Sequence, residues 1–129
     1  MSTSFWSFIY VGIGGMAGAL MRYSTSLGLQ KYSLFFPFGT LLSNWAGCFI
    51  IGIIAQLAEN TEILSPEARL LLATGFCGGF TTLSSMIFEM AQFARDGEVF
   101  YGSLYFLATF LGAFLSFYAG MLIIRLLFK

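Results

Sequence analysis

Four long apolar runs dominate the sequence and limit what it can fold into. They cover Phe5 to Leu29, Phe36 to Leu57, Leu70 to Phe93, and Phe100 to Phe128. Each run has at least about 20 residues, the length that a helix needs to cross the hydrocarbon core of a bilayer. Only short polar segments separate them. We therefore expect an all-α membrane protein with four transmembrane helices, built as one domain over residues 1–129.

The composition indicates that lipid surrounds these helices, and it excludes several classes of function. Only 9% of the residues are charged and 58% are hydrophobic, whereas soluble domains carry about 25% charged residues. The formal net charge is zero, so binding to nucleic acid lacks its usual electrostatic basis. The sequence contains no histidine and no nucleophile paired with a base, so it does not predict an enzyme.

Lysine and arginine give no preferred orientation in the membrane. Four spans would place three basic residues on each side: Arg69, Arg125 and Lys129 on one, and Arg22, Lys31 and Arg95 on the other. An excess of such residues normally marks the cytoplasmic side. Without it the chain could insert both ways, and two opposite copies could pair as an antiparallel dimer. The alternative is a single orientation that is fixed by other means.

The third run contains a polar, glycine-rich stretch near its middle. Thr74 to Thr82 holds three glycines and three threonines, and Ser84 and Ser85 follow closely. We expect the helix to be broken in this stretch, in the middle of the membrane. Non-helical backbone at that depth must be buried in protein or line a cavity, and its freed carbonyls can hold a cation. A glycine-rich packing notch is the alternative interpretation.

Two pairs of polar residues are spaced to share a helix face. Thr40 and Asn44 are four residues apart in the second run, and Tyr105 and Thr109 are four apart in the fourth. An amide in lipid must find a hydrogen-bond partner, an ion or water, because leaving it unsatisfied is costly. A hydrogen bond between helices and a position in the wall of a pore both remain open for Asn44.

Arg22 and Glu89 are the ionisable residues inside the runs. A charge within the membrane is a functional candidate by default, although both residues could also reach the interface. A proton-coupled pump would need a carboxylate near the midplane, and Glu89 follows the threonines by seven residues. Hydroxyl and amide donors beside a broken helix suit the passive movement of a small anion better than proton-coupled export.

Three motifs together resemble the bacterial fluoride channels of the Fluc or CrcB family. They are GGMAGALMR at Gly14 to Arg22, GTLLSN at Gly39 to Asn44, and GFCGGFTT at Gly75 to Thr82. Their order and spacing agree with the family, and the resemblance covers nearly the whole sequence. It implies a fluoride-selective channel, multi-pass in the cytoplasmic (inner) membrane, that lets fluoride leave the cell passively and limits its toxicity.

The resemblance also implies an assembly and a cofactor. The family forms a dual-topology antiparallel homodimer with two pores and one structural sodium ion at the centre of the interface. Backbone carbonyls of Gly78 and Thr81 from both subunits would hold the sodium. The implied partners are fluoride, the second subunit and membrane lipid, with no nucleic acid.

The family's functional residues are matched position by position. Arg22 matches the arginine at the pore vestibule, Asn44 the pore asparagine, and Glu89 the acidic residue after the break, with a possible gating role. Tyr105 and Thr109 match a polar track on the last helix. The expected anion path is formed by Arg22, Thr40, Asn44, Thr82, Leu83, Ser84, Ser85, Met86, Tyr105 and Thr109.

One departure from the family pattern bears on function. The family has two phenylalanines along the fluoride path where this chain has Leu83 and Met86, which lack the electropositive ring edge. Two other hypotheses therefore stay open. One is a non-conducting homologue, or one that needs a different partner chain in a heterodimer. The other is a small proton-coupled multidrug exporter, which would require a membrane carboxylate that the first run lacks.

Overall fold

The computed structural model describes residues 4–60 and 62–129, where every regular element is helical. In chain order these are α1 (Phe5–Gly28), the 3-10 turn η1 (Gln30–Tyr32), α2 (Phe38–Asn60), α3 (Pro66–Arg69), the π-helical segment η2 (Leu70–Cys77), α4 (Gly78–Phe80), α5 (Leu83–Arg95) and α6 (Val99–Leu127). Within the described residues the expected all-α class is confirmed.

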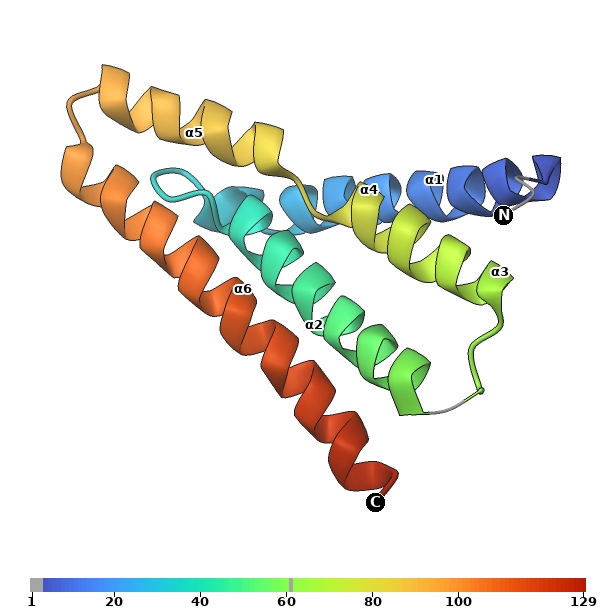
Figure 1. Cartoon of the computed structure of the whole chain (residues 1–129). Helices are drawn as coiled ribbons and strands as arrows, with labels where there is room; N and C mark the ends of the chain where they lie inside the picture. The colour runs from blue at the N-terminus through green and yellow to red at the C-terminus, as the bar shows by residue number, and fades with distance from the viewer. Residues whose placement is uncertain (1–3, 61) are drawn as a thin grey trace.

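The long helices pack as two pairs that the third apolar run connects (Figure 1). The helices α2 and α6 lie side by side and form the most extensive contact between any two elements. The helix α1 packs instead along η2 and α4. The helix α5 begins just after α4 and joins α6 through a tight turn, so the stretch 66–95 runs from one pair to the other.

Hydroxyl side chains mark where two of the shorter helices begin. Ser65 accepts a hydrogen bond from the Ala68 N–H at 3.1 Å at the start of α3. Thr82 accepts one from the Ser85 N–H at 3.2 Å at the start of α5. Such caps satisfy N–H groups that have no partner within the first turn of a helix. The second cap fixes where the helix resumes within the third apolar run.

Glycines let α1 approach the third run more closely than any other residue would allow. A Cβ atom added at Gly14 would lie 2.0 Å from the Leu71 carbonyl oxygen, and one at Gly18 would lie 2.0 Å from the Phe76 carbonyl oxygen. Both obstacles are backbone atoms, so no side chain could move aside. The GxxxG spacing therefore sets the contact between α1 and η2, as small residues do in membrane helix pairs.

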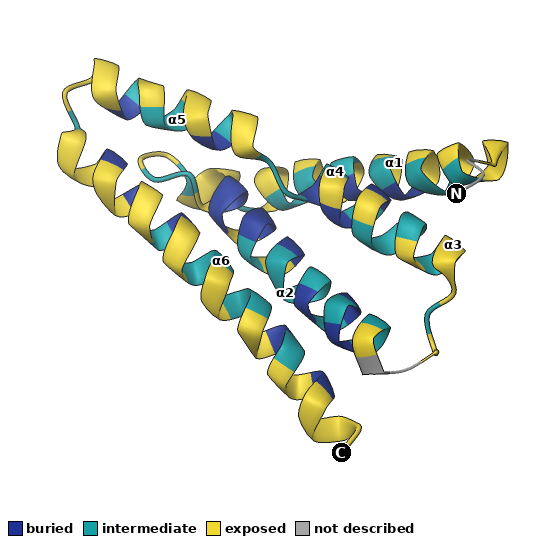
Figure 2. Cartoon of the chain, in the orientation of Figure 1, coloured by how far each residue is buried: buried dark blue, intermediate teal, exposed yellow. Residues whose placement is uncertain are grey.

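Most large apolar side chains lie on the outside of the chain (Figure 2). The outer face of α6 is apolar over most of its length, with Leu115 72% exposed. A small buried cluster of Leu41, Met86, Phe93 and Tyr105 joins α2, α5 and α6. Such extensive apolar exposure is stable in lipid and not in water. The chain is a multi-pass membrane protein.

The expectation of four transmembrane helices is confirmed for three of them, and the first run is the exception. By length and composition, three helical stretches of the described chain can cross a membrane: Phe38–Glu59, Pro66–Arg95 and Val99–Leu127. The helix α1 is long enough, at 24 residues, but is not among them. Its five glycines, its serines and Arg22 lower its mean hydropathy. Three of those glycines, Gly14, Gly15 and Gly18, face η2 and α4.

The interruption of the third run lies at its threonines and not at its glycines. Residues Gly75 to Gly79 are helical, in η2 and α4. Thr81 (φ −83°, ψ 153°) and Thr82 (φ −151°, ψ 119°) are extended, and α5 begins at Leu83. Gly75 and Gly79 pack closely on the backbone of α1, which holds this part of the run against that helix. The interruption therefore lies at the C-terminal end of the stretch 74–82, within which a break was expected.

Candidate functional site

The side chain of Asn44 pairs with the extended backbone at Thr82. The Asn44 Nδ2 group donates to the Thr82 carbonyl at 3.2 Å, and the Thr82 N–H donates to Asn44 Oδ1 at 2.7 Å. In an unbroken helix the Thr82 N–H would instead donate to the carbonyl of Gly78, four residues earlier. The amide of Asn44 thus replaces the helical hydrogen bond that the interruption removes.

Hydroxyl groups take over a second helical hydrogen bond. The N–H of Ser85 would donate to the Thr81 carbonyl in a regular helix, but it donates to Thr82 Oγ1. The hydroxyls of Ser84 and Ser85 each lie 3.2 Å from the same Thr82 oxygen. The carbonyls of Gly78 and Thr81 have therefore both lost the N–H donor that a continuous helix would direct at them.

Arg22 supplies a hydrogen bond at the end of α4. Its Nε–H donates to the Gly79 carbonyl at 3.1 Å, which places a positive charge where the helix dipole is negative. No carboxylate of the described residues forms an ion pair with it. Arg22 therefore joins α1 to the interrupted segment while its charge stays uncompensated within the described chain.

The carboxylate of Glu89 connects three helices. Thr40 Oγ1 on α2 donates to Oε1 at 2.6 Å, and the hydroxyl of Tyr105 on α6 donates to Oε2 at 2.5 Å. Thr40 is 7% exposed and Tyr105 is fully buried. Hydrogen bonds to a charged group contribute more than neutral ones. This carboxylate therefore holds α5 against the α2–α6 pair.

We expect Tyr105→Phe to lower stability by about 2 kcal/mol, because it removes a buried donor to a charged acceptor. The loss of folded protein on heating, measured by size-exclusion chromatography in detergent, would report the change. Tyr118→Phe is the matched control, since Tyr118 lies on the same helix and is 61% exposed. Equal stability of the two variants would mean that the bond to Glu89 contributes nothing.

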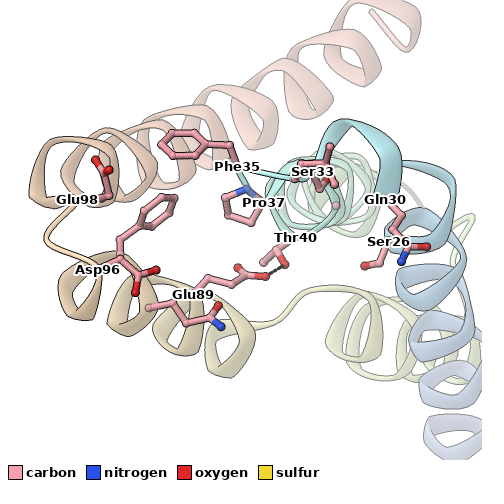
Figure 3. A pocket seen from close by; sticks show the side chains of 13 residues that line it. Ser26, Gln30, Ser33, Phe35, Pro37, Thr40, Glu89, Asp96 and Glu98 are labelled. Atoms are coloured by element: carbon pink, nitrogen blue, oxygen red, sulfur yellow. Dashed lines mark hydrogen bonds between the residues drawn. The ribbon is translucent and has the colours of Figure 1, made fainter.

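Two cavities adjoin these contacts. The larger, of about 400 Å³, lies beside the ends of α1, α2 and α5 and is shown in Figure 3. Thr40 and Glu89 line it, and the figure shows their hydrogen bond at its inner end. Asp96 and Glu98 add two more acidic groups to its wall. The larger cavity is therefore a polar vestibule whose formal charges are negative.

The smaller cavity, of about 210 Å³, lies at the interruption itself. Its wall is formed by Asn44, Cys48, Thr81, Thr82, Leu83, Met86, Thr109, Phe110 and Ala113. The residues come from α2, from the interruption, from α5 and from α6. Thr109 is 5% exposed, and its hydroxyl has no hydrogen-bond partner among the described residues. An ion in this cavity would thus lie beside an uncommitted buried hydroxyl.

The structure brings most of the expected path residues together, in two groups. Asn44, Thr82, Leu83, Met86 and Thr109 line the smaller cavity, and Thr40 and Glu89 line the larger one. The remaining four line neither cavity of the described chain: Arg22, Ser84, Ser85 and Tyr105. The first three of these are bonded to the interrupted segment, and Tyr105 to Glu89.

Sequence reasoning missed several residues at the smaller cavity. Cys48 and Ala113 stand one helical turn after Asn44 and Thr109, and both line the wall. The spacing of four could have identified them. It also missed Trp45, whose indole N–H donates to the Ala108 carbonyl at 3.1 Å. No sequence signal indicates that acceptor, because it is a backbone group on another helix.

Comparison with known proteins shows the family of this chain. The model of the family described as "CrcB-like protein, Camphor Resistance (CrcB)" matches residues 9–121. A protein of Chlorobium phaeobacteroides (strain BS1) is 48% identical over 126 residues, 98% of each chain. One of Chlorobium luteolum is 51% identical over 90% of each chain. One of Methanosarcina acetivorans is 35% identical over 89% of this chain and 88% of its own.

The two Chlorobium proteins are named fluoride-specific ion channel FluC, and the Methanosarcina protein fluoride-specific ion channel FluC 1. The family match extends over the α1 glycines and over every residue that lines the smaller cavity. This chain belongs to the CrcB family.

Proposed function

We propose that this chain forms a fluoride-specific ion channel, through which fluoride leaves the cell down its gradient. The observation that carries the proposal is the near full-length similarity to proteins named for that activity. The cavity at the interruption supports it independently, because it combines an amide, hydroxyl groups and an apolar wall. The channel is a transporter and not an enzyme, and passive export would limit fluoride toxicity.

The smaller cavity is the proposed anion path. Fluoride binds water strongly, so a selective path must offer hydrogen-bond donors in exchange. The Asn44 amide carries two N–H groups and gives one to Thr82, which leaves the other for an anion. Thr109 offers its uncommitted hydroxyl. The hydroxyls of Ser84 and Ser85 can turn toward an ion at the Thr82 edge of the cavity.

The flanks of the path have separate roles. Arg22 would draw anions toward the interruption, since no described carboxylate neutralises it. Glu89 is the candidate gate, because its carboxylate closes the inner end of the larger cavity through Thr40. Turning that carboxylate away would release α5 from both α2 and α6. Tyr105 would then lose its acceptor as well.

The functional unit in this proposal is an antiparallel homodimer of dual topology in the cytoplasmic membrane. The helix α1 would serve as the fourth span, since 24 residues extend over about 36 Å. The exposed surface at the interruption of the third run supports the presence of a second subunit. Gly78 is exposed, with nothing within 4 Å of an added Cβ, and Leu83 is 65% exposed. A second subunit would cover this surface in the middle of the membrane.

A sodium ion at the dimer interface fits the donor set of this chain. The carbonyls of Gly78 and Thr81 have lost their helical N–H donors, and hard cations prefer oxygen ligands. Two carbonyls from each subunit would hold the ion, which would supply a fixed positive charge near the anion path. We expect Gly78→Val to remove sodium from the purified dimer, as measured by elemental analysis, and Gly12→Val to retain it.

Leu83 and Met86 would form the apolar side of the path. Both line the smaller cavity, but Leu83 is 65% exposed and Met86 only 2%. Neither offers a ring edge to the anion, so recognition would come from the hydrogen-bond donors around the cavity and from the ring of Phe110 in its wall. A homologue that needs a different partner chain would instead take the missing rings from that partner. The experiment below separates the two cases.

Liposomes that hold the purified chain should release fluoride rapidly while they retain chloride. A fluoride electrode would follow the efflux under a potassium-valinomycin clamp, with empty liposomes as the baseline. Fluoride release at the baseline rate from a folded dimer would contradict the proposed homodimeric channel. Chloride release at the fluoride rate would contradict selectivity. Transport of an organic cation across the same liposomes, driven by a pH gradient, would indicate a proton-coupled exporter instead.

A further inference from the structure

Trp45 connects the two helices that carry the polar side chains of the smaller cavity. Its indole Nε1–H donates to the Ala108 carbonyl on α6 at 3.1 Å. Asn44 precedes Trp45 on α2, and Thr109 follows Ala108 on α6. Both of these neighbours line the smaller cavity, and Trp45 does not. The hydrogen bond between Trp45 and Ala108 therefore lies one residue away from a lining residue of the proposed path on each helix.

The indole ring is also fixed by its fit against Gly112. A Cβ atom added there would lie 2.2 Å from Cε2, 2.3 Å from Nε1 and 2.4 Å from Cζ2 of Trp45. These separations are far shorter than van der Waals contact, so the ring occupies the space that any larger residue at 112 would need. Gly112 follows Ala108 by one helical turn. The hydrogen bond and the ring contact therefore engage the same turn of α6.

The Thr109 hydroxyl is not held in place by a hydrogen bond of its own within the described chain. Its oxygen has no hydrogen-bond partner among the described residues. Its position across from Asn44 therefore depends on how α6 is placed along and around α2. The helix α5 contributes less to that placement, because it contacts α6 over a much smaller area than α2 does. The hydrogen bond from Trp45 joins α2 directly to α6 at this level.

We infer that Trp45 is a positioning residue for anion conduction. By bonding to Ala108 and packing on Gly112, it holds α6 against α2 at the level of the smaller cavity, and so sets the separation of Asn44 from Thr109. The close backbone approaches at Gly52 and Gly120 join the same two helices further along their length. This inference rests on the proposed path through the smaller cavity. Hydrogen-bond lengths vary by only a few tenths of an ångström. A displacement of α6 by about 1 Å would thus remove Thr109 from an ion that Asn44 holds.

Two substitutions disturb this contact from opposite sides. Trp45→Phe removes the N–H donor and keeps an aromatic ring, whereas Gly112→Ala keeps the donor and displaces the ring. We expect each to slow fluoride efflux from liposomes about tenfold, the factor that corresponds to one buried hydrogen bond. Trp45→Phe removes that bond directly, and Gly112→Ala breaks it by moving the indole away from Ala108. We also expect each to lower the ratio of fluoride to chloride efflux. Trp6→Phe is the matched control, since Trp6 is 65% exposed at the start of α1.

The change in Trp45 fluorescence when fluoride is added is a readout that a purely structural role of this residue would not produce. The chain has two tryptophans, so Trp45 is the only indole left in the Trp6→Phe variant. We expect fluoride to change its emission in a saturable way, and Thr109→Val to abolish that change. Gly112→Ala should slow fluoride efflux by a smaller factor when it is added to Trp45→Phe than when it is made in the parent chain. The smaller ring of phenylalanine leaves room for the new methyl group.

The outcomes separate this inference from the proposed path. If Thr109→Val conducts fluoride at the parental rate, the path is wrong and the role of Trp45 falls with it. If Thr109→Val is slow while Trp45→Phe and Gly112→Ala both conduct like Trp6→Phe, the path stands and the positioning role is rejected. Size-exclusion elution of each dimer checks folding. Should Trp45→Phe fail that check, Gly112→Ala and the Trp45 emission decide the question.

Discussion

The Asn44→Asp variant should conduct fluoride roughly a hundredfold more slowly than the parent chain. Aspartate keeps an acceptor for the Thr82 N–H, which bonds at 2.7 Å in the structure. It also places a second acceptor opposite the Thr82 carbonyl, where Asn44 now donates at 3.2 Å. A buried charged acceptor without a donor costs about 3 kcal/mol, which corresponds to roughly a hundredfold if it adds to the barrier.

The same change removes the N–H group that Asn44 would offer to the anion. Both effects act in the same direction, because a carboxylate repels fluoride and fails to hold the interrupted backbone. Asn44→Leu should be equally slow, since it offers neither a donor nor an acceptor. Fluoride efflux from liposomes measures both variants, after elution as a dimer has shown that they fold.

Gln56→Glu is the control for the general cost of a new carboxylate. Gln56 lies three turns after Asn44 on α2, is 6% exposed and lines neither cavity. We expect this variant to conduct fluoride far faster than Asn44→Asp. Equal rates for Asn44→Asp and the parent chain would show that the pairing with Thr82 is not needed for conduction. Equal slowing by both carboxylates would remove the special role of Asn44.

The sequence predicts the helices well because apolar length alone determines where a membrane helix can run. The run Phe5 to Leu29 became α1 (Phe5–Gly28), and Phe100 to Phe128 became α6 (Val99–Leu127). The third run was less predictable. Glycines and threonines together suggested a break within Thr74 to Thr82, but only the last two threonines leave the helix, and Gly75 and Gly79 pack against α1. That contact depends on two distant segments, which the pattern of one segment does not contain.

The candidate site, too, was partly predictable from the sequence. A spacing of four correctly places Thr40 with Asn44, and Tyr105 with Thr109, on shared helix faces. It does not say which neighbour each will meet. Thr40 and Tyr105 both bond to Glu89, whereas Asn44 and Thr109 line the cavity at the interruption. Helical periodicity gives the face of the helix on which each side chain lies. Its hydrogen-bond partner or cavity depends on how the interrupted segment and α5 pack against α2 and α6.

Gly18→Ala should prevent the chain from folding normally, whereas Gly12→Ala should not. A Cβ atom at residue 18 would lie 2.0 Å from the Phe76 carbonyl oxygen and 2.8 Å from the Phe80 nitrogen. Both are backbone atoms, so α1 must move away from η2 and α4. Overpacking costs about 1–3 kcal/mol where side chains can adjust. Here only the helices can adjust, so we expect at least the upper end of that range.

Gly12 provides a matched control on the same helix. An added Cβ there meets nothing within 4 Å, and alanine favours a helix over glycine by about 1 kcal/mol. Gly12→Ala should therefore be as stable as the parent chain or slightly more so. The fraction of each variant that elutes as a dimer after heating in detergent measures the difference.

The contrast matters because α1 reaches the path only through the third run. Arg22, one turn after Gly18 on α1, donates to the Gly79 carbonyl at the end of α4. Moving α1 outward would break that bond and free the backbone just before Thr81. If Gly18→Ala elutes and conducts like Gly12→Ala, the close packing of α1 is not what supports the interrupted segment. If it folds but conducts slowly, α1 controls the path through Arg22.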